Sequence, residues 1–337
     1  MELELIENLT SFQQLEREWN QLLLKSASHV PFLRHEFLSC WWQTLGGGEW
    51  EEGELYILTA RDPSQQLQGI APFFIHDKTL MFIGSYEISD YLDLIVPPDL
   101  SGPFIQILFD HLENQASRWE KIDLYNLKQE TPTLPVLKKT AGEKGWETRD
   151  EVLQPAPCIT LPKSWEEYLT GLENKHQHEI ERKIRRAEGY FLPVGWYIVE
   201  REENLDGEMD DFLKLMAYHP EKADFLTDVM RSQLRKIVHT AFKADWIQLS
   251  FLTVGGKKAA GYLNFDYDNH LWVYNSGIDP TFENLSPGWV LLSYLIQWAI
   301  DQGRHSFDFM RGDERYKYRF GGVDRYVVRM QIERGSP

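Results

Sequence analysis

Hydrophobic and polar residues alternate in many short runs of this chain, and stretches with helical spacing lie between them. Alternation with period two is typical of strands with one buried face, whereas an apolar repeat every three to four residues is typical of helices. The clearest series predicts a strand at 271–276, a polar loop at 279–285, a helix at 289–301 and a strand at 305–310. Because this helix is apolar almost all round, we expect it to lie against a sheet and to be covered on its other side.

The same order of elements occurs twice along the chain, which indicates a tandem duplication. Each half has three strands, a loop rich in Pro or Gly, a helix and a further strand, running over 55–127 and 246–310. Pro155-Ala156-Pro157 marks the boundary. We therefore predict an α/β fold of two tandem units, each a mixed, mostly antiparallel sheet flanked by helices, with domains at 1–155 and 156–337.

The remaining patterns add several elements to these two units. An apolar strand is predicted to end at Val96, before Pro97-Pro98. After the boundary, Ser164 is expected to cap one long charged helix that runs to Ala187. The last alternating run predicts a closing strand at 325–332.

Composition excludes several classes of protein. The 337 residues carry a formal net charge of −17, which argues against general DNA or RNA binding by bulk electrostatics. Cys40 and Cys158 form no disulfide framework, and His176 and His178 are two residues apart, so they cannot chelate a metal together on one helix. No apolar run reaches membrane-spanning length and no signal peptide is evident, so we expect a cytoplasmic protein without a metal.

The junction between the loop at 279–285 and the following helix is the first candidate site. Ser286 is a suitable N-cap, Pro287 suits the first helical position, and Gly288 would allow close approach to the backbone. The unpaired N–H groups of Gly288, Trp289 and Val290 would then attract a phosphate. An ordinary capped helix is the simpler alternative for these three residues.

A cluster of charged residues follows the strand at 305–310. It comprises the run Arg311-Gly312-Asp313-Glu314-Arg315-Tyr316-Lys317-Tyr318-Arg319. Charged side chains at the end of a strand, beside a helix start, occupy the place where open α/β sheets bind ligands. Asp308 lies within that strand between two phenylalanines, so burial could raise its pKa into a useful range. A solvated turn anchored by Asp308 is the structural alternative.

The run SPGWVLLSYLIQWAIDQGRHSFDFMRGDERYKYRFG resembles the signature segment of the CelD-type acetyltransferases. These belong to the GNAT superfamily and are related to the Fem-type peptidoglycan aminoacyltransferases. The resemblance covers roughly the last third of the chain. It implies a pair of GNAT-like units, with acyl transfer from acetyl-CoA or another acyl-CoA to a small or sugar-type acceptor, such as a nucleotide sugar of polysaccharide biosynthesis. At 283–288 this chain departs from the common pyrophosphate loop, because it has one glycine and no basic residue there.

Such a reaction needs a bound donor, a proton acceptor and a group that donates to the leaving thiolate or the oxyanion. We expect the backbone at the end of the strand 271–276 and the following helix start to bind the donor, through Tyr274, Asn275, Ser276, Ser286, Gly288 and Trp289. Asp308 is the first candidate for the proton acceptor, and Tyr316 and Lys317 are candidates for the donating group. Each of these residues also has a purely structural interpretation.

Acceptor binding is predicted at three places. Lys175, His178 and Arg182 share one face of the long helix, and the Fem-type relatives carry a similar basic helix that faces the substrate. Arg311 and Asp313 follow the strand that holds Asp308, and in the first half Asp90 and Tyr91 could line a cleft. Ion pairing within the helix and within the charged turn would explain the same residues.

Two further functions stay open. A Fem-type enzyme would take its acyl group from aminoacyl-tRNA, which the acidic composition disfavours and the basic helix favours. A non-catalytic module that binds partners of a polysaccharide synthesis complex would not need the dense ionisable cluster at 308–319.

Overall fold

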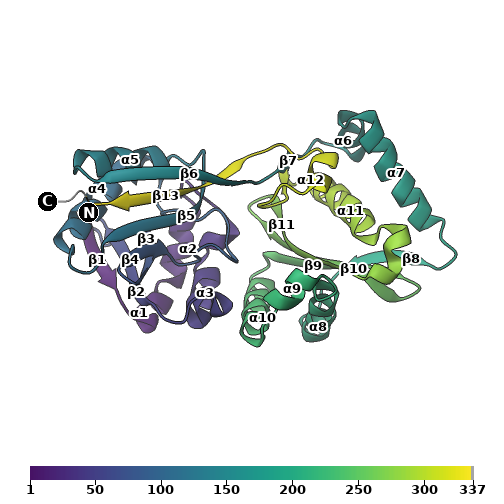
Figure 1. Cartoon of the computed structure of the whole chain (residues 1–337), viewed down its shortest axis with the longest axis horizontal. Coiled ribbons are helices and arrows are strands. Elements are labelled where there is room, and N and C mark those ends of the chain that lie inside the picture. The colour runs from purple at the N-terminus through teal and green to yellow at the C-terminus, as the bar shows by residue number, and fades with distance from the viewer. Residues whose placement is uncertain (335–337) are drawn as a thin grey trace. The chain divides into compact units, whose positions relative to one another are not determined.

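The computed structural model describes residues 1–334, which form two units (Figure 1). The first unit contains residues 1–155 and the described residues after Asp324, and the second contains residues 156–324. Each unit is a mixed sheet flanked by helices, as the alternating and helical patterns predict.

The sheet of the first unit has the strand order β1-β2-β3-β4-β5-β13-β6. All neighbours in it are antiparallel except β4 and β5, which are parallel and are joined through helix α4. The strands are β1 Glu2–Ile6, β2 Glu54–Arg61, β3 Leu67–His76, β4 Thr79–Phe82, β5 Lys121–Lys128, β6 Glu147–Pro155 and β13 Tyr326–Glu333. The helices are α1 Leu9–Gln14, α2 Glu16–Leu23, η1 Pro31–Leu33, α3 His35–Gly48, η2 Pro98–Leu100, α4 Ser101–Asn114 and α5 Thr133–Glu143.

The sheet of the second unit has the order β7-β12-β11-β10-β9-β8, and only β11 and β12 are parallel. Its strands are β7 Cys158–Thr160, β8 Val194–Ile198, β9 Ile247–Val254, β10 Lys257–Tyr267, β11 His270–Ile278 and β12 Ser306–Asp308. Its helices are α6 Trp165–Gly171, α7 Asn174–Glu188, η3 Glu202–Asn204, α8 Leu205–Met216, α9 Pro220–Phe225, α10 Asp228–Lys243, η4 Pro280–Leu285, α11 Pro287–Asp301 and α12 Arg315–Arg319.

The two sheets repeat one plan, which confirms the predicted tandem α/β fold. In each unit a run of antiparallel strands ends in a helix that crosses over to a parallel strand: α4 leads to β5, and α11 leads to β12. Beyond this parallel strand, each sheet adds an antiparallel neighbour from a distant part of the chain, which is β13 in the first unit and β7 in the second.

Strand β13 belongs to the first unit, whereas the sequence predicts it in the second domain. The alternating pattern correctly indicates a strand near the end of the chain, but the boundary near Pro155 assigns that strand to the second domain. Instead β13 pairs with β5 and β6 of the first unit, so that the second unit is inserted between β6 and β13. Alternation shows that a strand has one buried face, but it does not show which sheet it joins.

Two further elements differ from the sequence-based prediction. The long helix expected at 164–187 is broken at Leu172, which has an extended backbone after Gly171 and separates α6 from α7. The apolar run that ends at Val96 forms no strand and makes a single antiparallel bridge from Ile95 to Ile70. Its residues are buried, and burial alone explains why the run is apolar.

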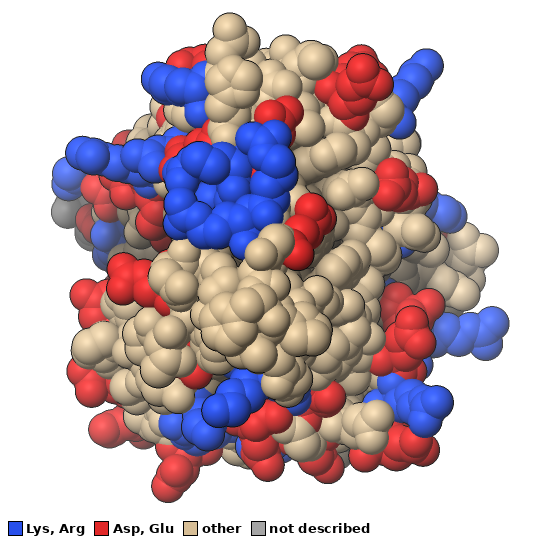
Figure 2. Space-filling view, turned by 90° about the vertical axis from the view of Figure 1, so that its right-hand side faces the viewer, with Lys and Arg blue, Asp and Glu red and all other residues tan. Residues whose placement is uncertain are grey.

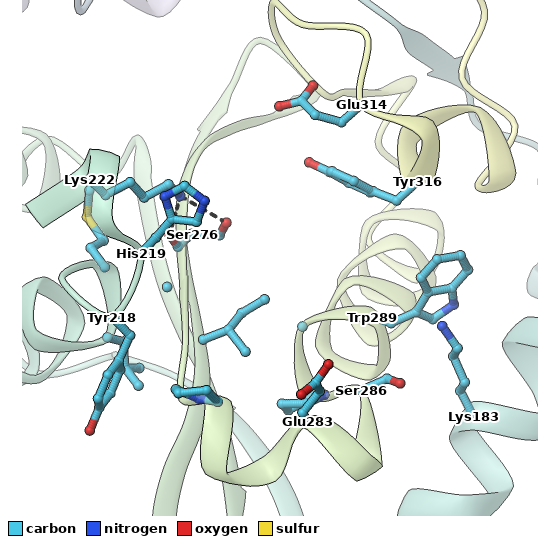
Figure 3. Close-up of a pocket in the computed structure, with 17 residues that line it drawn as sticks. Lys183, Tyr218, His219, Lys222, Ser276, Glu283, Ser286, Trp289, Glu314 and Tyr316 are labelled. Carbon is cyan, nitrogen blue, oxygen red and sulfur yellow. Dashed lines mark hydrogen bonds between the residues drawn. The ribbon is translucent and has the colours of Figure 1, made fainter.

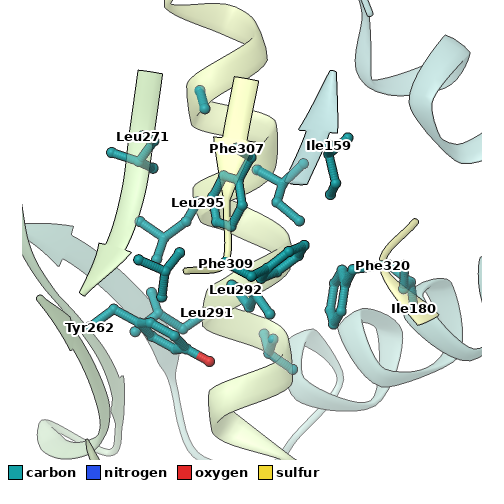
Figure 4. Close-up of a cluster of buried hydrophobic side chains, with 14 of the residues drawn as sticks. Ile159, Ile180, Tyr262, Leu271, Leu291, Leu292, Leu295, Phe307, Phe309 and Phe320 are labelled. Atoms are coloured by element: carbon teal, nitrogen blue, oxygen red, sulfur yellow. The ribbon is translucent and has the colours of Figure 1, made fainter. Parts of the chain in front are cut away.

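Helix α11 lies at the centre of the core of the second unit (Figure 4). Leu291, Leu292 and Leu295 pack against β10, β11 and β12 through side chains such as Phe307, and the other side of the helix is covered by α6 and α7. The expectation of a helix buried on both sides is therefore confirmed. This packing fixes the start of α11 against the sheet.

Glu49 follows α3 and carries a largely buried carboxyl group in the first unit. Burial raises its pKa from 4.5 to about 7, although hydrogen bonds from Trp50 and Tyr86 oppose the rise. The folded protein therefore holds this proton more tightly than the unfolded chain, and stability is lost as the pH rises through this interval. We expect Glu49→Gln to increase the free energy of unfolding by about 2 kcal/mol at pH 8 and to change it little at pH 4.

Urea denaturation at the two pH values would test this expectation, with the exposed neighbour Glu51→Gln as a control. An equal effect of Glu49→Gln at both pH values would contradict it.

Candidate functional site

Strands β11 and β12 separate from one another soon after they begin to pair. Their ladder covers only His270–Trp272 against Ser306–Asp308, whereas β11 continues to Ile278. Where it separates, β11 has a bulge: Leu263 and Asn264 of β10 face Asn275 and Val273, which leaves Tyr274 as an extra residue. A bulge bends its strand and redirects the side chains that follow. The end of β11 therefore presents backbone groups that β12 does not use.

The start of α11 lies beside this open edge. A Cβ on Gly288 would lie 2.4 Å from Cδ1 of Ile278 on β11, so the glycine lets the helix start close to the strand without displacing this side chain. Ser286 occupies the expected N-cap position of α11, but it has a left-handed backbone with φ 51° and ψ 54°, and its side chain makes no capping hydrogen bond. The N–H of Val290 donates to the carbonyl of Ser286. Only Gly288 and Trp289 then remain as the donors that helix geometry leaves unpaired.

A cavity of about 650 Å³ lies between the end of β11 and the start of α11 (Figure 3). This size is within the usual range for small-molecule sites. Side chains from α7, α8, α9, η4 and α12 complete its wall. The lining residues are Lys183, Leu215, Met216, Tyr218, His219, Lys222, Ser276, Gly277, Ile278, Pro280, Glu283, Ser286, Pro287, Gly288, Trp289, Glu314 and Tyr316.

Lys222 on α9 reaches the open edge of β11. Its Nζ donates to the carbonyl of Ser276 at 2.5 Å and to Oδ1 of Asn275 at 2.9 Å. Burial lowers the pKa of Lys222 to about 8, although the negative charge of Glu314 opposes this. At pH 7 about a tenth of the amine is therefore uncharged, far more than for an ordinary lysine. A lysine with such a pKa can act as a general base.

Tyr316 points from α12 toward the side of the cavity that carries Lys222 and Ser276 (Figure 3). Burial, and to a lesser degree the charge of Glu314, raises the pKa of Tyr316. The hydroxyl therefore stays protonated over the physiological range and can donate a proton or a hydrogen bond, but it cannot serve as a base.

Lys183 on α7 provides a cation on the other side of the helix start. Its Nζ lies 3.5 Å from the centre of the Trp289 ring and 3.3 Å from Oε1 of Glu179. Burial lowers the pKa of Lys183, and the charge of Glu179 opposes that effect. The basic residue that the loop at 283–288 lacks is thus supplied by a different helix.

The structure brings most of the expected donor-binding residues together. Ser276, Ser286, Gly288 and Trp289 line the cavity, and Asn275 accepts a hydrogen bond from Lys222. Tyr274, at the bulge, instead packs against Phe265, with the ring centres 4.8 Å apart. Tyr274 and Asn275 therefore lie at the edge of the expected donor site and are not among the residues that line the cavity.

Two of the three expected catalytic residues, Asp308 and Lys317, make contacts that stabilise the local backbone. Asp308 is buried, accepts a hydrogen bond from the N–H of Met310 at 2.7 Å, and is not part of the cavity lining. Lys317 is also buried, and its Nζ donates to the carbonyls of Met310, Arg311 and Gly312 and pairs with Glu314 at 2.8 Å. These contacts hold the charged turn closed, and they give both residues a structural role.

The expected acceptor-binding residues lie outside the cavity. Lys175, His178 and Arg182 are on the exposed face of α7, where Lys175 pairs with Glu173 at 2.8 Å and His178 lies 3.8 Å from Glu181. Arg311 and Asp313 are in the turn that Lys317 closes, and they do not line the cavity. In the first unit, Asp90 and Tyr91 are both buried.

The sequence does not identify Lys183, His219 or Lys222 as members of this site, whereas Glu314 belongs to the charged cluster that it does indicate. Glu314 and Lys183 belong to charged runs in which every member looks alike. The segment with His219 and Lys222 has no motif at all, and only the three-dimensional arrangement brings it to β11.

Comparison with known proteins gives a family for much of the second unit. A sequence model described as an acetyltransferase (GNAT) domain matches residues 174–318, which is somewhat less than half of the chain. No curated protein matches the sequence. The second unit therefore contains a GNAT domain, and this domain is an acyltransferase fold.

Solved structures resemble the whole chain. FemX matches with a TM-score of 0.66 at 11% identity, covering 98% of this chain and 97% of the other. L-PGS from Bacillus licheniformis matches with a TM-score of 0.58 at 12% identity, over 95% and 92% of the two chains. A tandem GNAT protein from the clavulanic acid biosynthesis pathway matches with a TM-score of 0.53 at 10% identity, over 100% of both. At such identities these similarities concern the fold.

Two features are absent from the described residues, 1–334. They contain no group of three or more His, Cys, Asp or Glu side chains that could hold a metal ion. None of their helices combines the length and apolar character needed to cross a bilayer.

Proposed function

We propose that this GNAT domain transfers an acyl group from a coenzyme A thioester, which binds in the cavity between β11 and α11, to an amine or hydroxyl of a small or sugar-type acceptor. The observation that carries this proposal is the open edge of β11 beside the start of α11. That arrangement offers backbone hydrogen bonds to an extended amide-containing arm and two N–H groups to a phosphate.

The donor would lie along β11 with its pyrophosphate at Gly288 and Trp289. Lys183 supports this placement, because its positive charge would offset a phosphate that the glycine-poor loop alone would bind weakly. Gly288 and Trp289 both line the cavity, so their backbone faces the space that a phosphate would occupy. The thioester would then reach the part of the cavity between Lys222 and Tyr316.

In this arrangement the acceptor attacks the thioester carbonyl directly. A new bond forms from the acceptor nitrogen or oxygen to the carbonyl carbon, and the carbon–sulfur bond breaks. Uncharged Lys222 takes the proton that the acceptor loses, and the Tyr316 hydroxyl donates to the departing thiolate. His219 lines the same part of the cavity and could relay the proton.

The finer features of the function remain proposals. We propose an acetyl donor and a CelD-type role in surface-polysaccharide biosynthesis in the cytoplasm, because the segment 286–321 resembles that family. The acidic character of Glu283 and Glu314 at the cavity favours an acceptor that carries a positive charge or several hydroxyl groups.

Fem-type transfer from aminoacyl-tRNA is the second candidate, and the match of FemX to almost the whole chain favours it. The two candidates differ in their salt dependence, because binding of tRNA phosphates weakens steeply as salt increases. A non-catalytic partner-binding role would not explain why the partly buried Tyr316 and Lys222, with its lowered pKa, both face the cavity.

Calorimetric titration with coenzyme A would test the position of the donor. Adding a side chain at Gly288 alone would push against Ile278, so we would make the changes in an Ile278→Ala background. There we expect Gly288→Asp to bind coenzyme A at least about tenfold more weakly than Gly288→Asn, because only aspartate places a negative charge beside the pyrophosphate.

The aspartate–asparagine pair has nearly the same shape, so it isolates the effect of charge. Equal affinity in the two variants would rule out the start of α11 as the pyrophosphate site. No binding to a folded wild-type protein would overturn the coenzyme A proposal and direct the search to aminoacyl-tRNA.

A further inference from the structure

The connection between α7 and β8 exposes two large apolar side chains. Phe191 is 80% exposed and Leu192 is 38% exposed, and they are adjacent at the tip of the loop. Single exposed apolar residues are common, but a neighbouring pair with an aromatic ring this exposed indicates a contact that the isolated chain does not make.

The tip is held in place by its neighbours. The N–H of Gly255 in the β9–β10 turn donates to the carbonyl of Pro193 at 2.8 Å. Tyr190 packs against the small core formed by Val254, Ala259 and Leu285, and its ring centre is 4.4 Å from that of Phe191. Phe191 therefore projects from a supported base.

Basic residues surround this tip in a protein that is otherwise strongly acidic. Arg182, Arg185 and Arg186 are exposed on the last turns of α7, and Lys257 is exposed at the β9–β10 turn. Figure 2 shows a compact cluster of Lys and Arg beside a largely uncharged surface on the face that carries the end of α7. With a net charge of −17 for the whole chain, such a cluster would orient the protein toward an anionic surface.

The acidic neighbours neutralise only part of this cluster. Glu181 lies 3.7 Å from Arg185, and the carboxylate of Glu188 accepts a hydrogen bond from Tyr294. Arg186 donates to the carbonyl of Asn284 at 3.0 Å, which is an uncharged partner. The cluster therefore retains excess positive charge.

We propose that this region docks on an anionic lipid surface. We call it the α7–β8 ridge and define it as Arg182, Arg185, Arg186, Phe191, Leu192 and Lys257. Phe191 and Leu192 enter the boundary between headgroups and acyl chains, and the basic residues contact the lipid phosphates.

The layered arrangement of the ridge favours lipid over other partners. It combines exposed apolar residues with exposed cations on one face, which matches a bilayer surface where anionic headgroups cover hydrocarbon. A nucleic acid would use the cations and an aromatic ring, but it offers no apolar layer for Leu192.

Docking would also bring the cavity close to the lipid. Arg186 bonds to Asn284 in η4, and Pro280 and Glu283 of the same segment line the cavity. An acceptor held at the membrane surface could then reach the cavity without leaving the lipid. The docking itself does not depend on which acyl donor is used.

Vesicle flotation with the whole protein would test the proposal. We expect the wild type to float with vesicles of phosphatidylcholine and phosphatidylglycerol at low salt, and to remain unbound with phosphatidylcholine alone or at high salt. Phe191→Ser should weaken partitioning about tenfold, and the double change Arg182→Glu with Arg185→Glu should weaken it by at least tenfold.

Matched changes elsewhere provide the controls. Val229→Ser removes another exposed apolar side chain, and Lys139→Glu reverses an exposed charge in α5, so both should float as the wild type does. Phe191→Ser should still bind coenzyme A normally, which keeps a failure of this proposal separate from a failure of the proposed reaction. Absence of flotation with anionic vesicles, or equal losses in the controls, would overturn the proposal.

Discussion

Replacing Lys222 with methionine should lower the acceptor-dependent release of coenzyme A thiol by about two to three orders of magnitude. Methionine keeps the apolar stem that packs in the cavity but removes the amine that bonds to Ser276 and Asn275. The loss should fall mainly on kcat, because the amine acts on the proton that the acceptor releases. The rate of thiol release, followed at saturating donor, measures it.

The direction in which kcat changes with pH follows from the lowered pKa of Lys222. The pKa of Lys222 is lowered to about 8, and only the uncharged amine can accept a proton. In the wild type, kcat should therefore rise about tenfold per pH unit below 8 and level off above it. In Lys222→Met this limb should be absent.

Two variants separate this role from simpler ones. Lys222→Arg keeps a positive charge but cannot lose a proton, so it should be nearly as inactive as Lys222→Met. Lys214→Met removes an exposed lysine of α8 outside this cavity and should retain full activity. If Lys222→Arg remained active, Lys222 would act through its charge instead of as a base.

Replacing Gly277 with alanine should destabilise the protein by about 3 kcal/mol. A Cβ at this position would lie 2.4 Å from the backbone nitrogen of Met216 and 2.5 Å from the carbonyl carbon of Leu215. These are backbone atoms of α8, so a rotation of a side chain cannot relieve the contact. Helix α8 would have to move away from β11, which would also distort the cavity wall. Urea denaturation followed by tryptophan fluorescence measures the loss.

Helix α8 itself provides the control for this change. Gly207 is exposed, and a Cβ there would meet no atom within 4 Å. We therefore expect Gly207→Ala to stabilise the protein by about 0.5 to 1 kcal/mol through its helix propensity. If Gly277→Ala were as stable as the wild type, the close packing of α8 on β11 would be refuted.

Sequence patterns predicted the arrangement of elements better than the members of the site. The alternating runs and the apolar helix at 289–301 gave the repeated plan, because burial on one or two faces leaves a direct mark on local composition. The same reasoning identified the start of α11, where Pro287 and Gly288 are readable from sequence alone.

The residues that line the cavity are harder to identify from the sequence. Asp308 and Lys317 are catalytic candidates in the sequence because they are charged residues at or near the end of a strand. In the structure, both make contacts that close the turn. Lys222 and Lys183 lie on helices that reach the cavity from elsewhere in the chain, and nothing near them in the sequence distinguishes them from surface lysines. Their roles depend on burial and on distant partners, which only the folded chain defines.

The insertion of the second unit between β6 and β13 has a consequence for synthesis on the ribosome. Residues 1–155 emerge first, but β13 is the only strand that pairs with β6 among the described residues, and it is also the antiparallel neighbour of β5. The second unit takes all its strands from residues 156–324 and can complete its sheet earlier. The nascent first unit must meanwhile keep an open strand edge, which is prone to wrong pairing. Of the two units, the one whose first strands are translated earlier is thus the one whose sheet is completed later.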